Sequence, residues 1–357
     1  MHGGDWQGAV ERYGWHPDEI IDFSANINPL GPPAGVLTAL RENLAAIRRY
    51  PDPCCRELKQ ALAAYLQVDT PAVIAANGAV ELIYLLCQAI KPRRVLIAEP
   101  TFGEYRRAAL VAGAEVVTLA LDPASAFTLT AADWERQLQG VELAFLCNPN
   151  NPTGRLLAGE TLEDIVNLCR EYGVFLVVDE SFIDFLPGWQ QLSLAARAAG
   201  ERGLFTLRSL TKIFALPGLR LGCGVGHPEL IAALAARHDP WSVNILAQIA
   251  GVAALAEREY LEATRALIGR EKEYLYRRLA ELAGFRPLHP EVNFILTGIA
   301  AGRLTVPRLA AQLARERILI RDCSSFPGLG AAYFRVAVRH RRDNTRLLAA
   351  LKDISCR

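Results

Sequence analysis

The stretch Ser209-Leu-Thr-Lys212-Ile-Phe-Ala-Leu-Pro-Gly-Leu-Arg220-Leu-Gly222 contains an isolated lysine. The chain has only five lysines, and Lys212 is the only one between Lys91 and Lys272. Since arginine serves as the cation almost everywhere else, this lysine indicates chemistry that arginine cannot perform. A lysine amine forms a Schiff base with an aldehyde, whereas a guanidinium does not. The alternative is a solvated loop lysine, because Ser-x-x-Lys is a common sequence.

Two stretches of the sequence are suited to binding a phosphate. Ser209 and Arg220 flank the lysine and offer a hydroxyl and a guanidinium, which are both donors to phosphate oxygens. Gly78, Ala79 and Val80 lie between a predicted strand and a predicted helix, where backbone N–H groups attract anions. An ordinary strand-to-helix turn would have the same composition. An aldehyde and a phosphate occur together in pyridoxal 5′-phosphate (PLP), so these stretches predict a PLP site.

The predicted secondary structure is α/β, with a large domain followed by a smaller α+β domain. Residues 1–33 read as an arm of turns with a short helical piece, 34–240 as the large domain and 241–357 as the small one. In the large domain apolar strands alternate with amphipathic helices, which predicts a mostly parallel seven-stranded sheet covered on both faces. These strands are expected at 73–76, 94–98, 115–119, 143–147, 175–179, 203–207 and 221–225. The small domain is expected to hold a helical region over 244–283, strands near 291–296, 318–322 and 333–337, and a last helix near 342–353.

The composition is that of a soluble globular enzyme. Of 357 residues, 51% are hydrophobic and 22% are charged, with a net charge of +1, so the chain has no general attraction for nucleic acid or anionic membranes. No apolar run approaches the roughly 20 residues that span a bilayer. The amino terminus lacks the features of a signal peptide, and we expect a cytoplasmic protein. The eight cysteines show no zinc or disulfide spacing and are expected to be free thiols.

Polar residues follow two of the predicted strands, and ligands bind at the carboxyl ends of parallel strands. Asn148-Pro-Asn150-Asn151-Pro-Thr-Gly154 follows one strand, and an asparagine amide there can donate to a ring hydroxyl. Asp179 and Glu180 end another strand. A carboxylate at this place can keep a pyridine nitrogen protonated, which makes the ring an electron sink.

Two nucleotide-binding classes are disfavoured. The paired carboxylates resemble the metal-binding strand of a nucleotide hydrolase, but the sequence contains no G-x-x-x-x-G-K-[ST]. Gly222-Cys-Gly224-Val-Gly226 has G-x-G-x-G spacing late in the α/β region, which argues against a nicotinamide site. We expect these glycines to let a strand pass close behind Arg220.

Three arginines lie beside the last predicted strands. Arg321, Arg335 and Arg339 each follow or begin an apolar segment. If they converge on a cleft, they offer forked donors for a carboxylate or a phosphate. Arginines at the solvated ends of strands are the alternative.

Five motifs, in this order, resemble those of the class I and II aminotransferases, which are PLP-dependent enzymes of fold type I. They are N-G-A-V-E, N-P-N-N-P-T-G, V-V-D-E-S-F, S-L-T-K…P-G-L-R-L-G and Y-F-R-V-A-V-R, and they span nearly the whole chain. The resemblance implies that Lys212 holds the cofactor covalently and that Asp179 bonds its ring nitrogen. It further implies that Asn151 donates to the ring oxygen, that Phe102 stacks on the ring, and that Ala79, Val80, Ser209 and Arg220 bind the phosphate.

The resemblance also implies a dimer with active sites at the subunit interface, because the residue matching Tyr50 reaches the cofactor phosphate of the partner subunit. Arg335 would hold the substrate carboxylate. Within the superfamily the chain is similar to histidinol-phosphate aminotransferases and to threonine-phosphate decarboxylases of cobalamin biosynthesis (CobD). The second family is favoured by the His2-Gly3-Gly4 start, by D-F-S-A-N-I-N-P-L-G around Asn26, and by R-I-L-I-R-D-C around Arg321. R-S-L-T-K and P-W-S-V-N are similar as well.

Phe182 also favours the decarboxylases, since aminotransferases usually place a tyrosine three residues after the aspartate. This resemblance implies decarboxylation of O-phospho-L-threonine to (R)-1-aminopropan-2-yl phosphate. The implied substrate contacts are His2, Gly3, Asn26, Asn151, Arg321 and Arg335. We expect His2, Asn26 and Arg321 to bind mainly the phosphate and Arg335 mainly the carboxylate.

One residue departs from the decarboxylase pattern. Asp5 stands where an asparagine can occur in that family, near the expected phosphate site, and it could adjust substrate choice or simply face solvent. Histidinol-phosphate transamination remains the alternative activity. A regulatory protein with a PLP-enzyme fold but no turnover is the alternative from another class. It is disfavoured because such proteins usually carry an added DNA-binding domain, for which this chain has no spare length.

Overall fold

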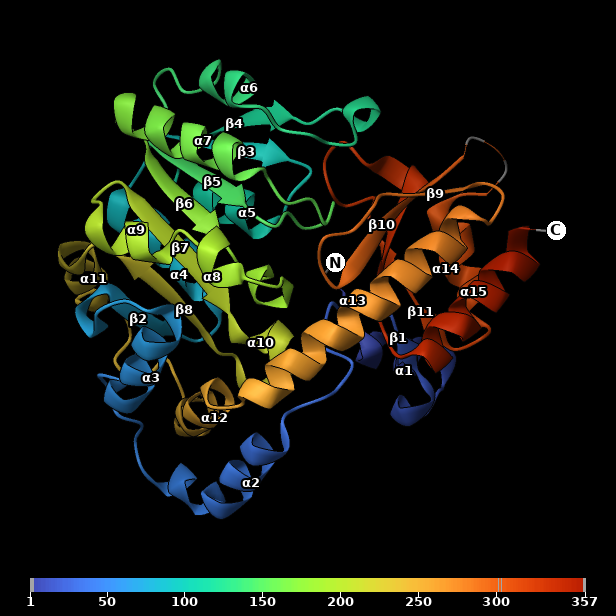
Figure 1. Cartoon of the computed structure of the whole chain (residues 1–357), viewed down its shortest axis with the longest axis horizontal. Helices are drawn as coiled ribbons and strands as arrows, with labels where there is room; N and C mark the ends of the chain where they lie inside the picture. Colours follow the sequence, from blue (N-terminus) through green and yellow to red (C-terminus); the bar gives the residue numbers. More distant parts are fainter. Residues whose placement is uncertain (1–2, 301, 303, 356–357) are drawn as a thin grey trace.

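The computed structural model describes residues 3–300, 302 and 304–355, and its larger part is built around a seven-stranded sheet (Figure 1). The strand order is β2-β8-β7-β6-β5-β3-β4. β8 runs antiparallel to β2 and β7, and the other neighbouring pairs are parallel, so the expected mostly parallel sheet is confirmed. The strands are β2 (Val73–Ala76), β3 (Arg94–Glu99), β4 (Glu115–Ala120), β5 (Leu143–Cys147), β6 (Phe175–Asp179), β7 (Leu204–Ser209) and β8 (Gly222–Gly226).

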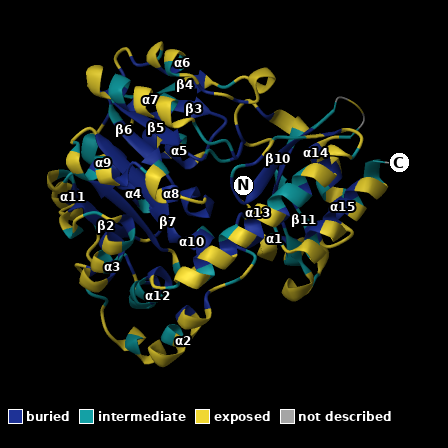
Figure 2. Ribbon diagram, in the orientation of Figure 1, coloured by how far each residue is buried: buried dark blue, intermediate teal, exposed yellow. Residues whose placement is uncertain are grey.

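Strand β5 shows why the central strands read as continuous apolar runs. All of its residues are buried, but successive side chains point to opposite faces of the sheet. Leu143 and Phe145 join the core under α4 and α5, while Ala144 and Leu146 join the core under α6 and α7. Figure 2 shows the resulting buried sheet between helices whose outer faces are exposed. These helices are α4 (Ala79–Ile90), α5 (Glu104–Val111), α6 (Ala131–Glu135) and α7 (Gly159–Glu171), with α8 (Trp189–Leu192), α9 (Ala195–Gly200) and α11 (Pro228–Ala235) elsewhere around the sheet.

The helical region expected over 244–283 is two helices. α12 (Ile245–Leu255) and α13 (Arg258–Ala280) are separated at Glu257, whose backbone is not helical. α12 packs on α2 (Ala34–Glu42) and α3 (Arg56–Leu66), so it lies beside the large sheet. α13 runs from there to the small sheet (Figure 1). α2 ends at Glu42, and a 3₁₀ helix, Leu44–Arg48, follows it.

The carboxyl-terminal part contains a four-stranded sheet in the order β12-β13-β10-β9. Its strands are β9 (Phe285–Pro287), β10 (Phe294–Ile299), β12 (Arg321–Asp322) and β13 (Tyr333–Ala337), with α14 (Val306–Ala314) and α15 (Arg341–Ser355) as its later helices. The strand expected at 291–296 begins later, because the backbone at Glu291 bonds instead to Gly154 and to the Lys272 amine.

The amino-terminal arm contains regular structure that its composition does not indicate. β1 (Ile21–Asp22) pairs in parallel with β11 (Ile318–Leu319). Because β11 pairs with the arm whereas β12 pairs with β13, the strand expected over 318–322 is divided between two sheets. The short helix expected in the arm is α1 (Trp6–Tyr13).

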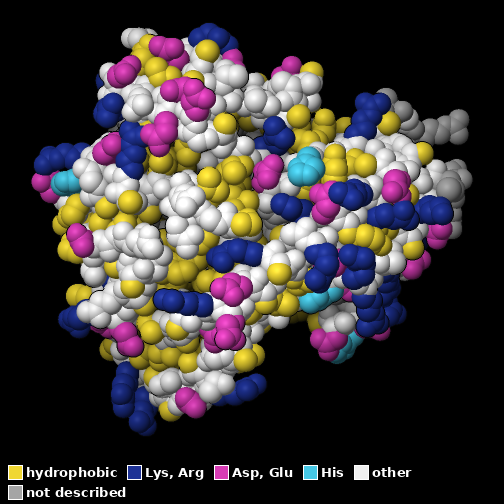
Figure 3. Space-filling model, viewed as in Figure 1, with side chains coloured by type: hydrophobic (Ala, Val, Ile, Leu, Met, Phe, Trp, Pro, Cys, Tyr) yellow, Lys and Arg dark blue, Asp and Glu magenta, His cyan; other side chains and the backbone are white. Residues whose placement is uncertain are grey.

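The surface mixes charges of both signs. Figure 3 shows acidic and basic side chains interspersed over this face, in keeping with the net charge of +1. Among the described residues, no helix combines the length and the apolar character needed to cross a bilayer. Seven of the eight cysteines lie in the described part of the chain, and all seven are free, as expected.

Candidate active site

Lys212 lies in the first turn after strand β7, on the short helix α10 (Leu210–Ile213). Its Nζ donates to Ser209 Oγ at 2.8 Å. The arm fixes this turn from outside, because the backbone N–H of Asn28 donates to the Lys212 carbonyl at 3.0 Å and its side-chain amide donates to the Ile213 carbonyl at 2.8 Å. The backbone that carries the amine is therefore held by a residue of the arm that is distant in sequence.

The surroundings of Lys212 favour a neutral amine. Burial lowers the pKa of Lys212 to about 8, and the charge of Arg220 acts in the same direction, while Asp179 opposes both. The side chain nevertheless keeps partial exposure through the mouth of a cavity. A lysine that is neutral in a useful fraction near neutral pH, and is reached by solutes, can act as a nucleophile and as a base.

One side of this cavity is built to hold an anion. Ala79 and Val80 begin helix α4, whose first N–H groups have no partner within the helix. Ser209 and Arg220 line the same cavity. The set offers backbone amides, a hydroxyl and a guanidinium, which fits a phosphate group.

Two glycines allow these groups to come together. Gly78 has φ of +80°, and a Cβ there would lie 2.5 Å from Arg220 Nη2. A Cβ at Gly222 would lie 2.3 Å from the backbone nitrogen of Ala79. The glycines of β8 therefore do permit a close approach, but to the start of α4 and, at Gly224, to the ring of Phe205. The glycine that lies close to Arg220 is Gly78.

The opposite side of the cavity suits a flat ring with a basic nitrogen. Asp179 ends strand β6 and is 5% exposed. Its Oδ1 accepts from the Ser181 backbone at 2.9 Å, and its Oδ2 accepts from the Tyr105 hydroxyl at 2.6 Å. Asn151 and the aromatic rings of Phe102 and Phe182 line the same cavity.

Phe182 borders the lysine and brings no hydroxyl to it. Its ring centroid lies 6.0 Å from Lys212 Nζ, and its edge-to-face contact with Phe294 has a centroid distance of 4.9 Å. Phe182 is buried and lines the cavity, so at this position the cavity wall has no phenol hydroxyl.

The loop after β5 is tied to the loop after β3 by Asn150. Its side-chain amide donates to the Pro100 carbonyl at 3.0 Å, and its Oδ1 accepts from the Thr101 hydroxyl at 2.8 Å. These bonds fix the loops that carry Asn151 and Phe102. The polar turn predicted after this strand therefore has a structural role in addition to presenting Asn151.

Arg335 connects the cavity to the small sheet. The residue is 5% exposed, and its guanidinium donates to Asn151 Oδ1 and, at 3.0 Å, to the Ser24 carbonyl. Its Nε is buried without a hydrogen-bond partner. Burial lowers the pKa of Arg335 to about 10. Both partners are neutral oxygens, so the positive charge is not balanced by them.

Arg321 stands directly opposite Arg335 in the β12–β13 pair. Residues in this relation have side chains on the same face, and like charges there destabilise a sheet. Arg321 donates to Ser325 Oγ at 2.8 Å, which is again a neutral partner. Two facing arginines with neutral partners indicate a place for a ligand that carries negative charge.

The remaining predicted contacts are not among the residues that line the cavity around Lys212, and Gly3 lines a cleft together with Arg321. Asn26 is buried, and its Oδ1 has no hydrogen-bond partner. A Cβ at Gly3 would lie 2.2 Å from the Ser24 carbonyl oxygen, so the arm needs glycine there. His2 lies outside the described residues. Tyr50 is 79% exposed and packs on Trp241 at 4.9 Å, so one chain does not bring it to its own cavity.

Asp5 and Arg339 have contacts that need no ligand. The Asp5 carboxylate accepts from the Gly8 backbone at 3.0 Å and caps α1. It also lines a cleft of about 580 Å³ together with Arg321. Arg339 Nε donates to Asp343 at 2.8 Å.

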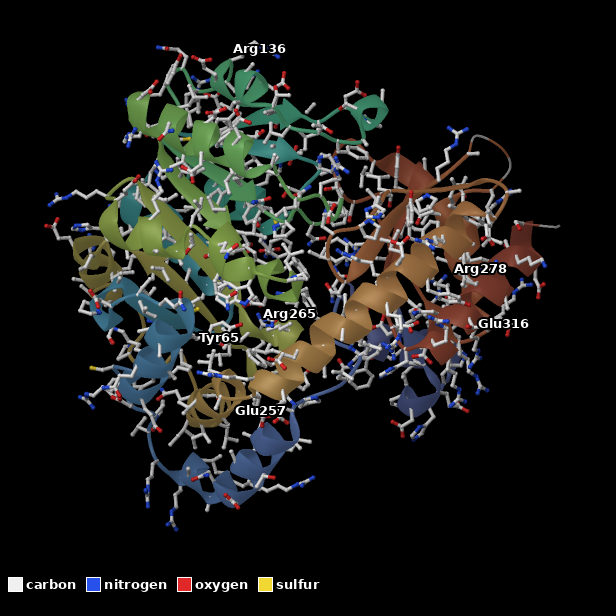
Figure 4. The ribbon with its side chains drawn as sticks, in the orientation of Figure 1. Tyr65, Arg136, Glu257, Arg265, Arg278 and Glu316 are labelled. Atoms are coloured by element: carbon white, nitrogen blue, oxygen red, sulfur yellow. The ribbon has the colours of Figure 1, made fainter. Side chains whose placement is uncertain are left out.

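Glu180 lies on the reverse side of the strand end that carries Asp179. It is 1% exposed and forms an ion pair at 3.1 Å with Arg208, which also pairs with Asp184 at 2.9 Å. Tyr65 and Arg265, labelled in Figure 4, reach Asp184 from α3 and α13. This buried cluster joins β6 and β7 behind the cavity.

Residues 18–351 match the model of the family described as aminotransferase class I and II. With the fold and the cavity described above, this match means that the chain belongs to the class I and II aminotransferases. The fold class expected from the five motifs is confirmed.

Individual relatives carry two different activities. The chain is 39% identical over 354 residues to the threonine-phosphate decarboxylase of Salmonella typhimurium, covering 99% of this chain and 96% of that protein. A solved histidinol-phosphate aminotransferase from Clostridium acetobutylicum is 30% identical with a TM-score of 0.86, covering 94% of this chain and 98% of that one. The L-threonine-O-3-phosphate decarboxylase structure from Porphyromonas gingivalis is 28% identical with a TM-score of 0.82, covering 94% and 99%. The fold is shared by both activities and does not by itself distinguish them.

Proposed function

We propose that this protein is a PLP-dependent decarboxylase of O-phospho-L-threonine, which forms (R)-1-aminopropan-2-yl phosphate for cobalamin biosynthesis. The observation that carries the proposal is the facing pair Arg321 and Arg335, joined to the cofactor cavity through Asn151. O-phospho-L-threonine carries a phosphate and a carboxylate, so it supplies one anion for each arginine. The 39% identity to a threonine-phosphate decarboxylase supports this choice of substrate.

The residues around the cavity fit PLP. The start of α4, Ser209 and Arg220 would hold its phosphate, with Asp179 at its ring nitrogen, Asn151 at its ring oxygen and Phe102 against its ring. Lys212 would hold its aldehyde carbon. When bound, PLP accepts the electron pair left on the substrate Cα after bond cleavage.

The residues of this chain would select the bond that breaks. Arg335 would anchor the substrate carboxylate, while Arg321, Asn26 and His2 would anchor the phosphate. Anchoring both ends fixes the torsion about Cα, and the Cα–carboxylate bond can then be held perpendicular to the ring. The carboxylate would leave as carbon dioxide, and Lys212, whose pKa is lowered to about 8, would supply the proton that takes its place on Cα.

We further propose a homodimer, a cytoplasmic location and the division of the chain into an arm, a large and a small domain at residues 33 and 240. Tyr50 supports the dimer because it is exposed beside other exposed apolar side chains. In a dimer it would reach the cofactor phosphate of the partner subunit. The other exposed apolar side chains in this region are Leu44, Ile47 and Trp241.

The test is incubation of the PLP-loaded protein with O-phospho-L-threonine in the absence of a keto acid. We expect release of carbon dioxide together with the phosphorylated amino alcohol. Amino transfer from histidinol phosphate to the cofactor, without release of carbon dioxide from O-phospho-L-threonine, would overturn the proposal in favour of histidinol-phosphate transamination. Unphosphorylated L-threonine is the matched control, and it should react poorly because Arg321 gains no anion.

A further inference from the structure

A buried tyrosine stands behind the carboxylate that faces the cavity. Tyr105, on α5, is fully buried, and its hydroxyl donates to Asp179 Oδ2 at 2.6 Å. The Ser181 backbone donates to the other carboxylate oxygen at 2.9 Å. Each oxygen of Asp179 therefore has a neutral donor that leaves its negative charge in place.

The position of the Tyr105 hydroxyl is fixed by ring packing. The ring stacks on Phe145, with centroids 5.1 Å apart and planes 9° apart. It also meets the edge of Phe102, with centroids 5.6 Å apart and planes at 82°. Phe102 and Asp179 both line the cavity, so Tyr105 touches the stacking ring and the carboxylate at once.

The hydroxyl acts as a donor throughout the ordinary pH range. Burial raises the pKa of Tyr105 well above its usual value, and the nearby charge of Asp179 raises it further. The phenol therefore stays protonated and stabilises the charged form of the carboxylate. Phe182, which also lines the cavity, has no hydroxyl to offer.

We propose that Tyr105 is a positioning residue, which orients the Asp179 carboxylate and sets its basicity toward the ring nitrogen of PLP. The inference rests on the PLP site of the proposed function. The phenol does not touch the reacting atoms in this assignment and acts only through Asp179.

Tyr105→Phe tests the assignment because it keeps the ring packing and removes only the donor. Without that donor Asp179 is a stronger base and takes a larger share of the proton, so the cofactor ring is less positive. A less positive ring raises the pKa of the nitrogen that links Lys212 to the cofactor, so this nitrogen keeps its proton to higher pH. We expect the pH midpoint of the absorbance change of PLP-loaded protein to rise by about 0.5–1 pH unit. We expect the Kd for PLP, titrated into the apoprotein, to rise about 2–10-fold.

Tyr84→Phe is the matched control. The Tyr84 hydroxyl donates to Glu104 at 2.7 Å, so this variant also removes a phenol–carboxylate bond, from a tyrosine that is not among the cavity-lining residues. It should leave both the pH midpoint and the Kd for PLP unchanged. A double variant, Tyr105→Phe with Asp179→Asn, should behave like Asp179→Asn alone, because Tyr105→Phe keeps the ring that lines the cavity and removes only the hydroxyl that bonds Asp179.

The outcomes are distinct. A midpoint and a Kd unchanged in Tyr105→Phe, or effects that simply add in the double variant, would overturn the inference and leave the proposed function standing. A shift of equal size in Tyr84→Phe would overturn it too, since the effect would then be general to the core. An unmodified protein that binds no PLP would overturn the proposed function and this inference with it.

Discussion

Asp179 and Glu180 are consecutive residues at the end of one strand, and their side chains meet opposite environments. Asp179 faces the cavity, where Tyr105 and the Ser181 backbone donate to it. Glu180 faces the reverse side, where Arg208 pairs with it at 3.1 Å and the Leu194 backbone and Ser193 hydroxyl each donate at 2.7 Å. Burial raises the pKa of Glu180, against the lowering effect of Arg208.

The difference shows which of the two carboxylates is free to bind a cationic ligand and which one stabilises the fold. Glu180 has its cation within the protein, and its donors leave little capacity for a ligand. Asp179 has only neutral donors and lines the cavity, so a positive ring nitrogen can still bind to it. One strand end thus presents a carboxylate with neutral donors to the cavity on one face and is anchored to β7 through the carboxylate on the other.

The largest expected effect comes from Asp179→Asn. An amide cannot hold a proton on the ring nitrogen, so kcat should fall about 10²–10⁴-fold while the protein remains folded. Steady-state release of carbon dioxide, with circular dichroism as the folding control, measures this. A kcat within a few-fold of the unmodified enzyme would contradict the role given to Asp179.

Glu180→Gln should show the opposite pattern. It leaves Arg208 with Asp184 as its remaining carboxylate partner, and breaking a buried pair lowers the free energy of unfolding by about 3–5 kcal/mol. Denaturant unfolding of the apoprotein measures the loss. Glu163→Gln, which removes a partly exposed pair with Arg197, is the control and should cost about 0–1 kcal/mol. If Glu180→Gln abolished turnover without destabilising the fold, the structural role given to Glu180 would be wrong.

Arg321→Ala should act on the substrate and not on the cofactor. Loss of a charge-assisted bond to phosphate should raise KM for O-phospho-L-threonine about 10–100-fold, with the PLP absorbance retained. Arg286→Ala, an exposed arginine of the same small sheet, should change neither. Loss of PLP binding in Arg321→Ala would place this arginine in the cofactor site instead.

The smallest expected effect is a dependence on pH. Because the pKa of Lys212 is lowered to about 8, the amine is protonated below pH 8 and neutral above it. Since only the neutral amine reacts, the rate of PLP association with the apoprotein should rise about tenfold per pH unit below pH 8 and level off above pH 8. The unfolded chain binds this proton up to its ordinary pKa of 10.5, so stability from this group increases between about pH 8 and 10.5. A rate that keeps rising to pH 10 would indicate an ordinary lysine.

Most of the fold and of the cofactor cavity could be predicted because their signals are local. The seven strands are short apolar runs bounded by turns, and Lys212, Asp179 and Asn151 occur in motifs next to strand ends. Parallel strands bring such ends to one edge of a sheet, so residues far apart in sequence come together without further information.

The remaining contacts depend on pairings that no local pattern encodes. Asn28 reaches the Lys212 turn across 184 positions of sequence, and β1 pairs with β11 only once the arm has folded back. Tyr105 stands three residues after Phe102 in the sequence, a spacing that puts both near one face of a helix start. That spacing could have indicated that Tyr105 lies near Phe102. The hydrogen bond from Tyr105 to Asp179 on β6, however, depends on tertiary packing that no local pattern shows.

The most direct test of the central claim is the number of carbon dioxide molecules released per active site from O-phospho-L-threonine labelled in its carboxyl group. The assay contains PLP-loaded protein and no keto acid. We expect many turnovers per site, with the cofactor absorbance restored after each. Release of less than one equivalent, accompanied by transfer of the substrate amino group to the cofactor, would contradict it.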